Sequence, residues 1–398
     1  MKNKRAIVIF IVAILVIGGG LFFFRHRQSD DDVNVDVSNI ETTPEITKVM
    51  DESVDGFRMH PFPLTKDEKK YETLMEQFLK KKMLNDGTFI TNYKVTKDQS
   101  KGELATGHDR LSESSGLWLR HLALTGQKKA FDDFYKETKK HFYRGGQFSY
   151  RLNADKTLSP VNATVDDLRI MRALIEAAAK FNDNQYIKEL ESLLPSFSKQ
   201  SIQGNMMVDF YDIDKKRASS DISLYYLELQ TMGYIYKKMG ISQKYLEYEY
   251  NILKDGYISD AFPFYYAQYS YKDNQYVKKD TINVIESLLS ILYLAEIGEQ
   301  KQESIDYIKE AVTTGTLYNK YDLQGNPVDK SQSSASYAIV AMIAKEINDK
   351  DLYQQALQII HNFQIITPQS PIFGVIGDPT TLEVFSYNNL MALLAYDY

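Results

Sequence analysis

The sequence contains no cysteine and a single tryptophan. The absence of cysteine excludes disulfides, thiolate metal sites, cysteine nucleophiles and a lipid-modified cysteine within these residues. The six histidines are scattered, with no pair at the spacing of an HExxH zinc motif, so we expect no metal and no cofactor. Acidic and basic residues are interspersed, the formal net charge is -6, and no basic stripe is present, so we expect no nucleic-acid partner.

The chain is long, and it is rich in apolar residues and in tyrosine. Its 398 residues are 43% hydrophobic, which is enough for one large core or for two ordinary domains. It also carries 29 tyrosines and 20 phenylalanines. A tyrosine ring has an apolar face and a polar edge, so it suits contacts with sugars as well as core packing. Composition alone favours core packing.

An apolar run near the N-terminus predicts a membrane anchor. Residues Ala6–Phe24 carry no charge and follow three positive charges in the first five residues. At about 1.5 Å per residue this run can just span a bilayer. We expect an uncleaved signal-anchor in residues 1–27, with the remainder outside the cell, and a cleaved signal peptide is the alternative. Residues 28–57 are acidic and predict a flexible tether, so residues 58–398 are the expected globular domain.

From residue 64 onward the hydrophobic pattern predicts helix after helix. The expected segments are 64–84, 115–126, 128–142, 167–181, 184–200, 222–240, 242–256, 281–298, 303–315, 334–348, 351–363 and 387–398. Those starting near residues 115, 167, 222, 281, 334 and 387 are apolar nearly all round, and their starts are about 52 to 59 residues apart. The others are amphipathic. Buried helices alternating with amphipathic ones predict an all-α (α/α)6 barrel of six inner and six outer helices, with an open solenoid as the alternative.

The connections that precede the inner helices are long, polar and rich in tyrosine, and they fall at one rim of such a barrel. Stretches such as QFSYRL and MVDFYDID alternate like strands, so we expect short β-hairpins there. Several carboxylates also open or precede inner helices, namely Glu113, Asp166, Asp167, Asp221, Asp273 and Asp280. Each is compatible with helix capping, and Asp221 and Asp280 fit that explanation best. Together they place acids around one mouth, as hydrolysis of a glycosidic bond requires.

Two stretches resemble glycoside hydrolase family 8. They are LSESSGLWLRHLALTGQKKAFDDFYKETKKHF and NATVDDLRIMRALIEAAAKF. The resemblance implies an (α/α)6 barrel, and with the apolar N-terminus it is greatest to the exopolysaccharide hydrolases of Gram-positive biofilm operons. It further implies that Glu113 is the general acid and that Asp167 lines the site. It places the general base in the loop before the fourth inner helix, where we prefer Asp273 to Asp280. The family inverts the anomeric carbon, which implies carboxylates about 6.5–9.5 Å apart.

The sequence also departs from the family pattern. Ser114 stands where the first motif has glycine, and Val165 stands where the second has its first aspartate. A small shift of the loop would allow Asp166 to replace that aspartate. The family's Arg-x-Pro-Trp-Arg text is absent, and Tyr276 and Lys278 lie in its place. We expect Asp166 and Tyr276 to bind substrate, and we do not carry over a cellulase specificity.

The sequence thus predicts an extracellular, membrane-anchored endo-glycosidase. Its substrate would be a cell-surface or secreted exopolysaccharide, and its partners the membrane, through Ala6–Phe24, and a polysaccharide synthase or export complex. The alternative is a catalytically degenerate glycan-binding module of such a complex. A polysaccharide lyase is a weaker reading, because the acidic rim does not favour uronate substrates.

Overall fold

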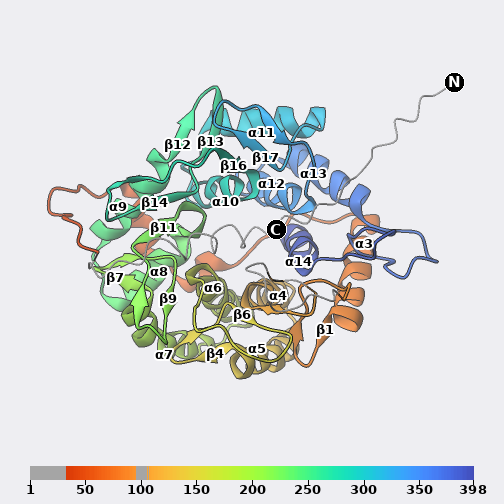
Figure 1. Ribbon diagram of the computed structural model, residues 1–398, viewed down its shortest axis with the longest axis horizontal. Coiled ribbons are helices and arrows are strands. Elements are labelled where there is room, and N and C mark those ends of the chain that lie inside the picture. The colour runs from red at the N-terminus through yellow and green to blue at the C-terminus, as the bar shows by residue number, and fades with distance from the viewer. Residues whose placement is uncertain (1–32, 96–104, 106) are drawn as a thin grey trace.

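A computed structural model describes residues 33–95, 105 and 107–398, which form a ring of paired helices (Figure 1). The inner helices are α4 (Ser112–Leu124), α6 (Thr164–Phe181), α8 (Leu229–Met239), α10 (Val284–Ala295), α12 (Ser334–Glu346) and α14 (Ser386–Asp397). The outer helices are α3 (Lys66–Phe78), α5 (Lys128–Phe142), α7 (Gln185–Gln200), α9 (Gln243–Asp255), α11 (Gln302–Thr314) and α13 (Lys350–Phe363). Each inner helix contacts the next, and α14 returns to α4. The described part is therefore a closed barrel, as predicted, and not an open solenoid.

Burial separates the two kinds of helix as the sequence pattern predicted. Every residue of α10 is buried, because this helix is covered by its inner neighbours and by the elements outside it. In the outer helix α5 the buried positions are spaced along one face and include Phe131, Phe134 and Phe142. The opposite face of α5 carries charged residues. An all-round apolar helix and an amphipathic helix therefore mark the inner and outer layers here.

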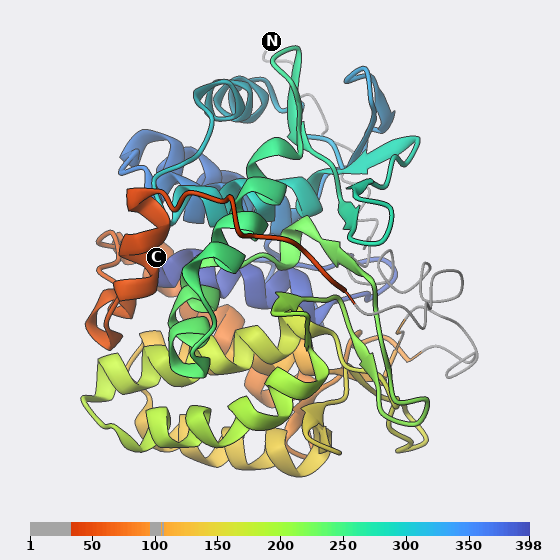
Figure 2. The same ribbon diagram turned by 90° about the vertical axis from the view of Figure 1, so that its left-hand side faces the viewer.

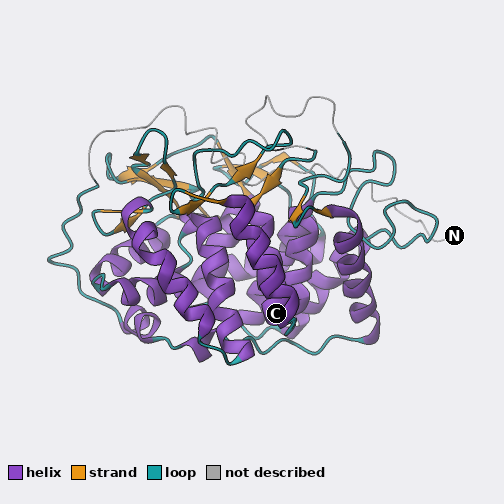
Figure 3. Ribbon diagram, turned by 90° about the horizontal axis from the view of Figure 1, so that it is seen from below, coloured by secondary structure: helices purple, strands orange, loops and turns teal. Residues whose placement is uncertain are grey.

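The loops at one end of the barrel contain the strands, and Figure 3 shows them gathered there. The two-stranded sheets pair β1 (Leu84–Asn85) with β2 (Thr88–Phe89), β3 (Arg110–Leu111) with β6 (Arg151–Leu152), β4 (Tyr143–Arg144) with β5 (Gln147–Phe148), β7 (Ile202–Gln203) with β8 (Met206–Met207), β9 (Tyr211–Asp212) with β10 (Arg217–Ala218), and β12 (Tyr257–Ser259) with β13 (Phe262–Tyr265). The three-stranded sheets are β11 (Asp221–Ser223), β14 (Gln268–Ser270) and β15 (Gln275–Tyr276), and β16 (Thr281–Asn283), β17 (Lys320–Asp322) and β18 (Pro327–Asp329). The predicted rim of short β-hairpins is confirmed.

Two predicted helix caps are wrong. Asp221 begins strand β11, which pairs with β14, and α8 starts eight residues later at Leu229. Asp280 is exposed and precedes strand β16, whereas the side chain of Asn283 accepts the hydrogen bond that caps α10. In both places, residues that the local pattern assigned to a helix instead form a strand, because they pair with a strand that is distant in sequence.

The segment before the barrel is ordered over much of the predicted tether. Helix α2 (Pro44–Asp51) packs against α8 and α9, and Ile46 is fully buried. The Thr43 hydroxyl donates to the carboxylate of Glu247 in α9, at 3.0 Å. Figure 2 shows the segment before α2 running over the outside of the barrel. The prediction of a flexible tether over residues 28–57 is therefore wrong from residue 44 onward. Within the described residues no helix is long and apolar enough to cross a membrane. The predicted anchor, Ala6–Phe24, lies outside them.

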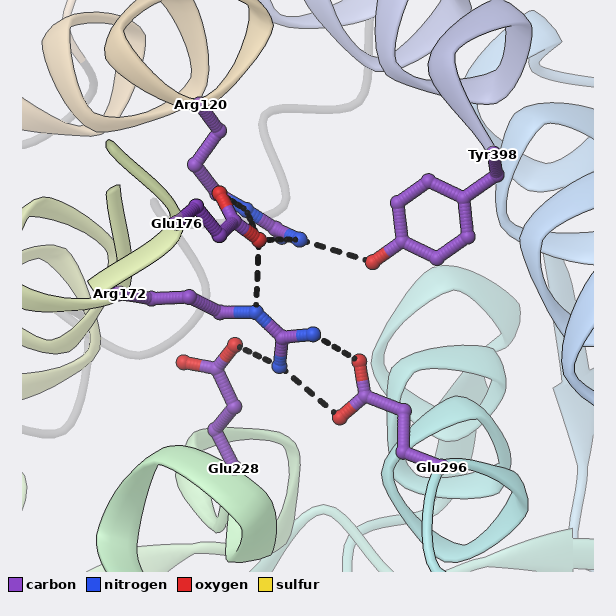
Figure 4. Close-up of polar contacts among 6 residues, drawn as sticks. All are labelled: Arg120, Arg172, Glu176, Glu228, Glu296 and Tyr398. Atoms are coloured by element: carbon purple, nitrogen blue, oxygen red, sulfur yellow. Dashed lines mark hydrogen bonds and ion pairs between the residues drawn. The ribbon is translucent and has the colours of Figure 1, made fainter. Parts of the chain in front are cut away.

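The interior of the barrel contains a network of charged side chains (Figure 4). Arg172 of α6 contacts three carboxylates, from Glu176 at 3.1 Å, Glu228 at 2.8 Å and Glu296 at 2.9 Å. Glu176 also pairs with Arg120 of α4, at 2.8 Å. Each of these side chains is less than a tenth exposed. The network joins α4, α6, the start of α8 and the end of α10. Buried charges are tolerated there because they are paired.

Candidate active site

Glu113 is the second residue of α4, at the rim of the barrel. Strand β3 fixes where this helix begins, because Leu111 pairs with Arg151 of β6. Ser112 is the first residue of the helix. Its hydroxyl donates to Asp166 Oδ2 at 2.9 Å, which ties the start of α4 to the start of α6.

The carboxyl of Glu113 is buried and incompletely bonded. Its residue is 3% exposed, and its Oε2 atom has no hydrogen-bond partner among the described residues. Arg169 Nη1 lies 3.5 Å from that atom. Burial raises the pKa of Glu113 to about 8, Arg169 opposes this increase, and the nearby carboxylate of Asp166 adds to it. The carboxyl therefore holds its proton near neutral pH, which is the state that a general acid needs.

Asp166 is the neighbour of Glu113, and Arg169 joins the two. Asp166 Oδ1 accepts a hydrogen bond from Arg169 Nη1 at 3.0 Å, in addition to the bond from Ser112. Burial raises the pKa of Asp166, and Arg169 opposes that increase. Val165, which stands where the family motif has aspartate, is fully buried in the core. The structure thus brings Asp166 next to Glu113 through Arg169, and a contact of Asp166 with substrate stays a prediction.

Asp167 has different contacts. One of its oxygens accepts from the backbone N–H of Phe148 at 3.0 Å, and the other accepts from the side-chain amide of Asn162. Burial raises its pKa to about 7. Both of these partners belong to the rim loops, so Asp167 holds the loops against the start of α6. A direct contact of Asp167 with substrate stays a prediction.

The remaining predicted residues lie on or near the β14–β15 hairpin. Asp273 is in its exposed turn, where the Ser270 hydroxyl lies 3.3 Å from Asp273 Oδ2. Tyr276 is in β15, and its hydroxyl donates to the backbone oxygen of Ile252 of α9 at 2.8 Å. Asp280 is exposed just before β16. The pairing of Asp273 with Glu113 across a cleft therefore stays a prediction.

Several residues around Glu113 were missed by the sequence reasoning. The hydroxyl of Tyr387, in the first turn of α14, is buried without a hydrogen-bond partner among the described residues. Burial raises its pKa, and the charge of Glu113 adds to the increase. Arg169 opposes that increase, and Tyr293 adds to it. Arg169 had a readable signal, because it is a cation in an inner helix of mainly apolar residues, three residues after Asp166.

Two further buried carboxyls lie at the rim. Asp209 accepts from the backbone N–H of Ser223 at 2.6 Å and from the Gln268 amide at 3.0 Å, and burial raises its pKa to about 7. Glu286 lies in the first turn of α10, which is opposite α4 in the ring (Figure 1). Burial raises the pKa of Glu286, and Lys279 and Lys320 oppose the increase. Glu286 is thus another buried acid in the first turn of an inner helix, and the motif comparison did not reveal it.

Comparison with known proteins identifies the architecture. No family model matches the chain. It is 26% identical over 324 residues to the protein named "Putative lipoprotein YdaJ" of Bacillus subtilis (strain 168), covering 80% of this chain and 85% of that protein. Among solved structures, one described as a novel alpha-amylase from Clostridium perfringens is 28% identical, with a TM-score of 0.76 over 84% of this chain and 99% of the other.

Two other structures extend the likeness at lower identity. PssZ from Listeria monocytogenes is 20% identical, with a TM-score of 0.62 over 85% of this chain and 97% of that chain. Endoglucanase Cel10, a family 8 glycosyl hydrolase from Klebsiella pneumoniae, is 14% identical, with a TM-score of 0.55 over 81% and 97% of the two chains. The described chain therefore has the fold of family 8 glycoside hydrolases, and the resemblance stated from its motifs is confirmed at the level of the fold.

Proposed function

We propose that the chain is an endo-acting glycosidase in which Glu113 is the general acid. The observation that supports this most is a buried carboxyl, incompletely bonded and with a pKa raised to about 8, at the rim of a glycosidase-type barrel. A carboxyl of this kind can give its proton to the oxygen of the leaving sugar. Arg169 and Asp166 set the balance of charge around it, and Tyr387 presents a hydroxyl nearby.

We further propose an inverting reaction with Asp273 as the base. In such a reaction the base takes a proton from a water molecule, and the water oxygen bonds to the anomeric carbon. The bond from that carbon to the leaving oxygen breaks while Glu113 protonates the oxygen. The base must stand on the opposite face of the sugar, about 6.5–9.5 Å from the acid. We propose that Asp273, in the turn of the β14–β15 hairpin, occupies that position. Asp280 and Glu286 are the competitors.

The proposed substrate is a cell-surface or secreted polysaccharide. The likeness to a structure described as an alpha-amylase makes α-glucans the first polymers to test. We also propose that Ala6–Phe24 anchors the chain at the membrane. The related YdaJ is named a lipoprotein, whereas the present 398 residues include no cysteine that a lipid could modify.

The acid is tested with the full chain purified in detergent. We expect new reducing ends from the cognate polymer, and a loss of about 100-fold or more in rate for Glu113→Gln, because the amide has no proton to donate. Glu189→Gln is the matched control, since Glu189 lies in the outer helix α7 and pairs with Lys139. Full cleavage by Glu113→Gln would remove Glu113 from the role. Binding without any cleavage would instead support the degenerate glycan-binding module.

The base is tested by comparing three variants. Asp273→Asn should reduce the rate as severely as Glu113→Gln, whereas Asp280→Asn and Glu286→Gln should retain most of it. Proton NMR of the first product should show the anomer opposite to that of the cleaved bond. A severe loss in Glu286→Gln with Asp273→Asn active would transfer the role to Glu286. Retention of the anomer would refute the inverting reaction.

A further inference from the structure

A groove lies on the flank of the barrel, between helix α9 and the β14–β15 hairpin. Its volume is about 820 Å³, within the range of ligand sites. Tyr248, Asn251 and Asp255 line it from the helix. These residues lie three, four or seven positions apart, so they project from one face of α9. The hairpin supplies the opposite wall, and Figure 1 shows α9 and β14 side by side.

The groove is distinct from the surroundings of Glu113. Successive residues of a strand point to opposite faces of its sheet. In β14, Gln268 reaches Asp209 among the buried carboxyls of the rim, whereas the next residue, Tyr269, lines the groove. The two faces of β14 therefore look toward Asp209 on one side and toward the groove on the other, and Glu113 is not among the residues that line the groove. A ligand in the groove would contact residues of the same hairpin that carries Asp273.

The walls of the groove combine aromatic rings with amides. Three tyrosines line it, together with the side-chain amides of Asn251, Asn274 and Gln275. The lining also holds one acidic residue, Asp255, and one basic residue, Lys278, so its formal charges cancel. Rings provide apolar faces for the C–H surfaces of a sugar, and amides donate to and accept from hydroxyl groups. This lining suits a neutral ligand with many hydroxyl groups better than an anionic or cationic one.

The side chains of the groove are already held in place. The hydroxyls of Tyr269 and Tyr248 donate to Asn274 Oδ1, at 2.6 Å and 3.3 Å. The ring of Tyr276 stacks on that of Tyr266, with ring centres 5.4 Å apart. A site whose side chains are ordered before binding loses less conformational entropy when the ligand arrives.

We propose that this groove is a second glycan-binding site, which holds a neutral stretch of the polysaccharide outside the catalytic cleft. The proposal rests on the proposed function for its choice of ligand. A polysaccharide bound in the groove is held beside the catalytic cleft. Its effective concentration at the proposed acid is therefore higher. The site then contributes to the handling of long polymers and contributes nothing for an oligosaccharide too short to reach from the cleft to the flank.

The test is affinity gel electrophoresis of the full chain in detergent. Gels contain soluble starch or hydroxyethylcellulose, and every protein carries Glu113→Gln so that the polymer stays intact. We expect the pair Tyr248→Ala and Asn251→Ala to weaken retention about fivefold. Tyr248→Phe keeps the ring and should keep most of the retention. The matched control is Tyr245→Ala, because Tyr245 lies on the same helix outside the groove lining.

A second measurement separates this proposal from the proposed function. In the chain with Glu113 intact, the groove variants should raise KM for the polymer and leave kcat/KM for a trisaccharide or tetrasaccharide unchanged. Unaltered retention in the groove variants, or no retention by either polymer, would overturn the second site, whatever the cleavage assay shows. Retention that depends on the groove in a chain that cleaves nothing would leave the second site standing and overturn the glycosidase.

Discussion

Removal of the Arg172 guanidinium tests the charge network that fills the barrel. This one cation contacts the carboxylates of Glu176, Glu228 and Glu296, which come from α6, the start of α8 and the end of α10. In Arg172→Met the side chain keeps a similar length and the three acids lose their shared partner. Deleting one partner of a buried ion pair lowers the free energy of unfolding by about 3–5 kcal/mol. That is a large part of the 5–15 kcal/mol of an ordinary domain.

The loss in the free energy of unfolding of Arg172→Met should be larger at high pH than at low pH. Burial raises the pKa of Glu296 to about 7 in the folded chain, above the ordinary 4.5, and Arg172 opposes that increase. Without Arg172 the pKa of Glu296 rises further. A carboxyl with a raised folded-state pKa binds its proton more tightly when folded, so lower pH favours folding. The deficit of Arg172→Met should therefore be greatest near pH 8 and should shrink as the pH falls toward 5.5.

Urea denaturation followed by circular dichroism measures the free energy of unfolding of both proteins. The comparison at pH 8 and at pH 5.5 gives the pH dependence of the difference. Lys128→Met is the matched control, because Lys128 forms a 2.7 Å pair with Asp183 in which both side chains are partly exposed. Such a pair contributes about 0–1 kcal/mol. A deficit below about 1 kcal/mol for Arg172→Met at pH 8, or one that grows at pH 5.5, would refute the account of the network.

Three other predictions follow from single contacts. His121 lies 2.8 Å from Asp397 and its pKa is raised to about 9 from 6.5, so the stability that it contributes is complete below pH 6.5 and is lost as the pH rises through 9. His121→Gln should flatten that decline in urea midpoints, and an equal decline in the variant would exclude His121 as its source. Ile46→Ala should lower the free energy of unfolding by about 2–5 kcal/mol, because Ile46 is fully buried in α2, and an effect near zero would restore the flexible tether. Asp166→Asn removes a charge that raises the pKa of Glu113, so the alkaline limb of kcat/KM against pH should move to lower pH, and a move to higher pH would contradict the geometry.

The barrel could be predicted because its two layers differ in composition over whole helices. An all-round apolar segment has no stable place except between other elements, and the regular spacing of such segments predicts a repeat. The signal for α2 was also present, since Ile46, Val49 and Met50 have helical spacing and are the buried residues of that helix. The acidic composition of the surrounding stretch outweighed it in the sequence reasoning. Composition averaged over thirty residues therefore hid an eight-residue helix.

The local starts of the inner helices could not be predicted in the same way. Asp221 and Asp280 stand before apolar segments, as caps do, yet β11 pairs with β14 and β16 pairs with β17. These pairings join residues about 40 or more positions apart. No window of sequence around an aspartate contains its future strand partner, so capping and strand pairing are locally indistinguishable at these points.

The candidate site could be predicted only where it depends on local sequence. The motif predicts Glu113 as the acid from residues at one helix start, and the structure shows that this residue is buried. The partners that set its chemistry come from elsewhere, because Arg169 belongs to α6 and Tyr387 to α14. Arg169 meets Glu113 where α6 packs on α4, and Tyr387 meets it only when α14 closes the ring against α4. An acid that depends on ring closure has its raised pKa only in the folded barrel, so any change that opens the contact between α14 and α4 should weaken the acid before it unfolds the outer layer.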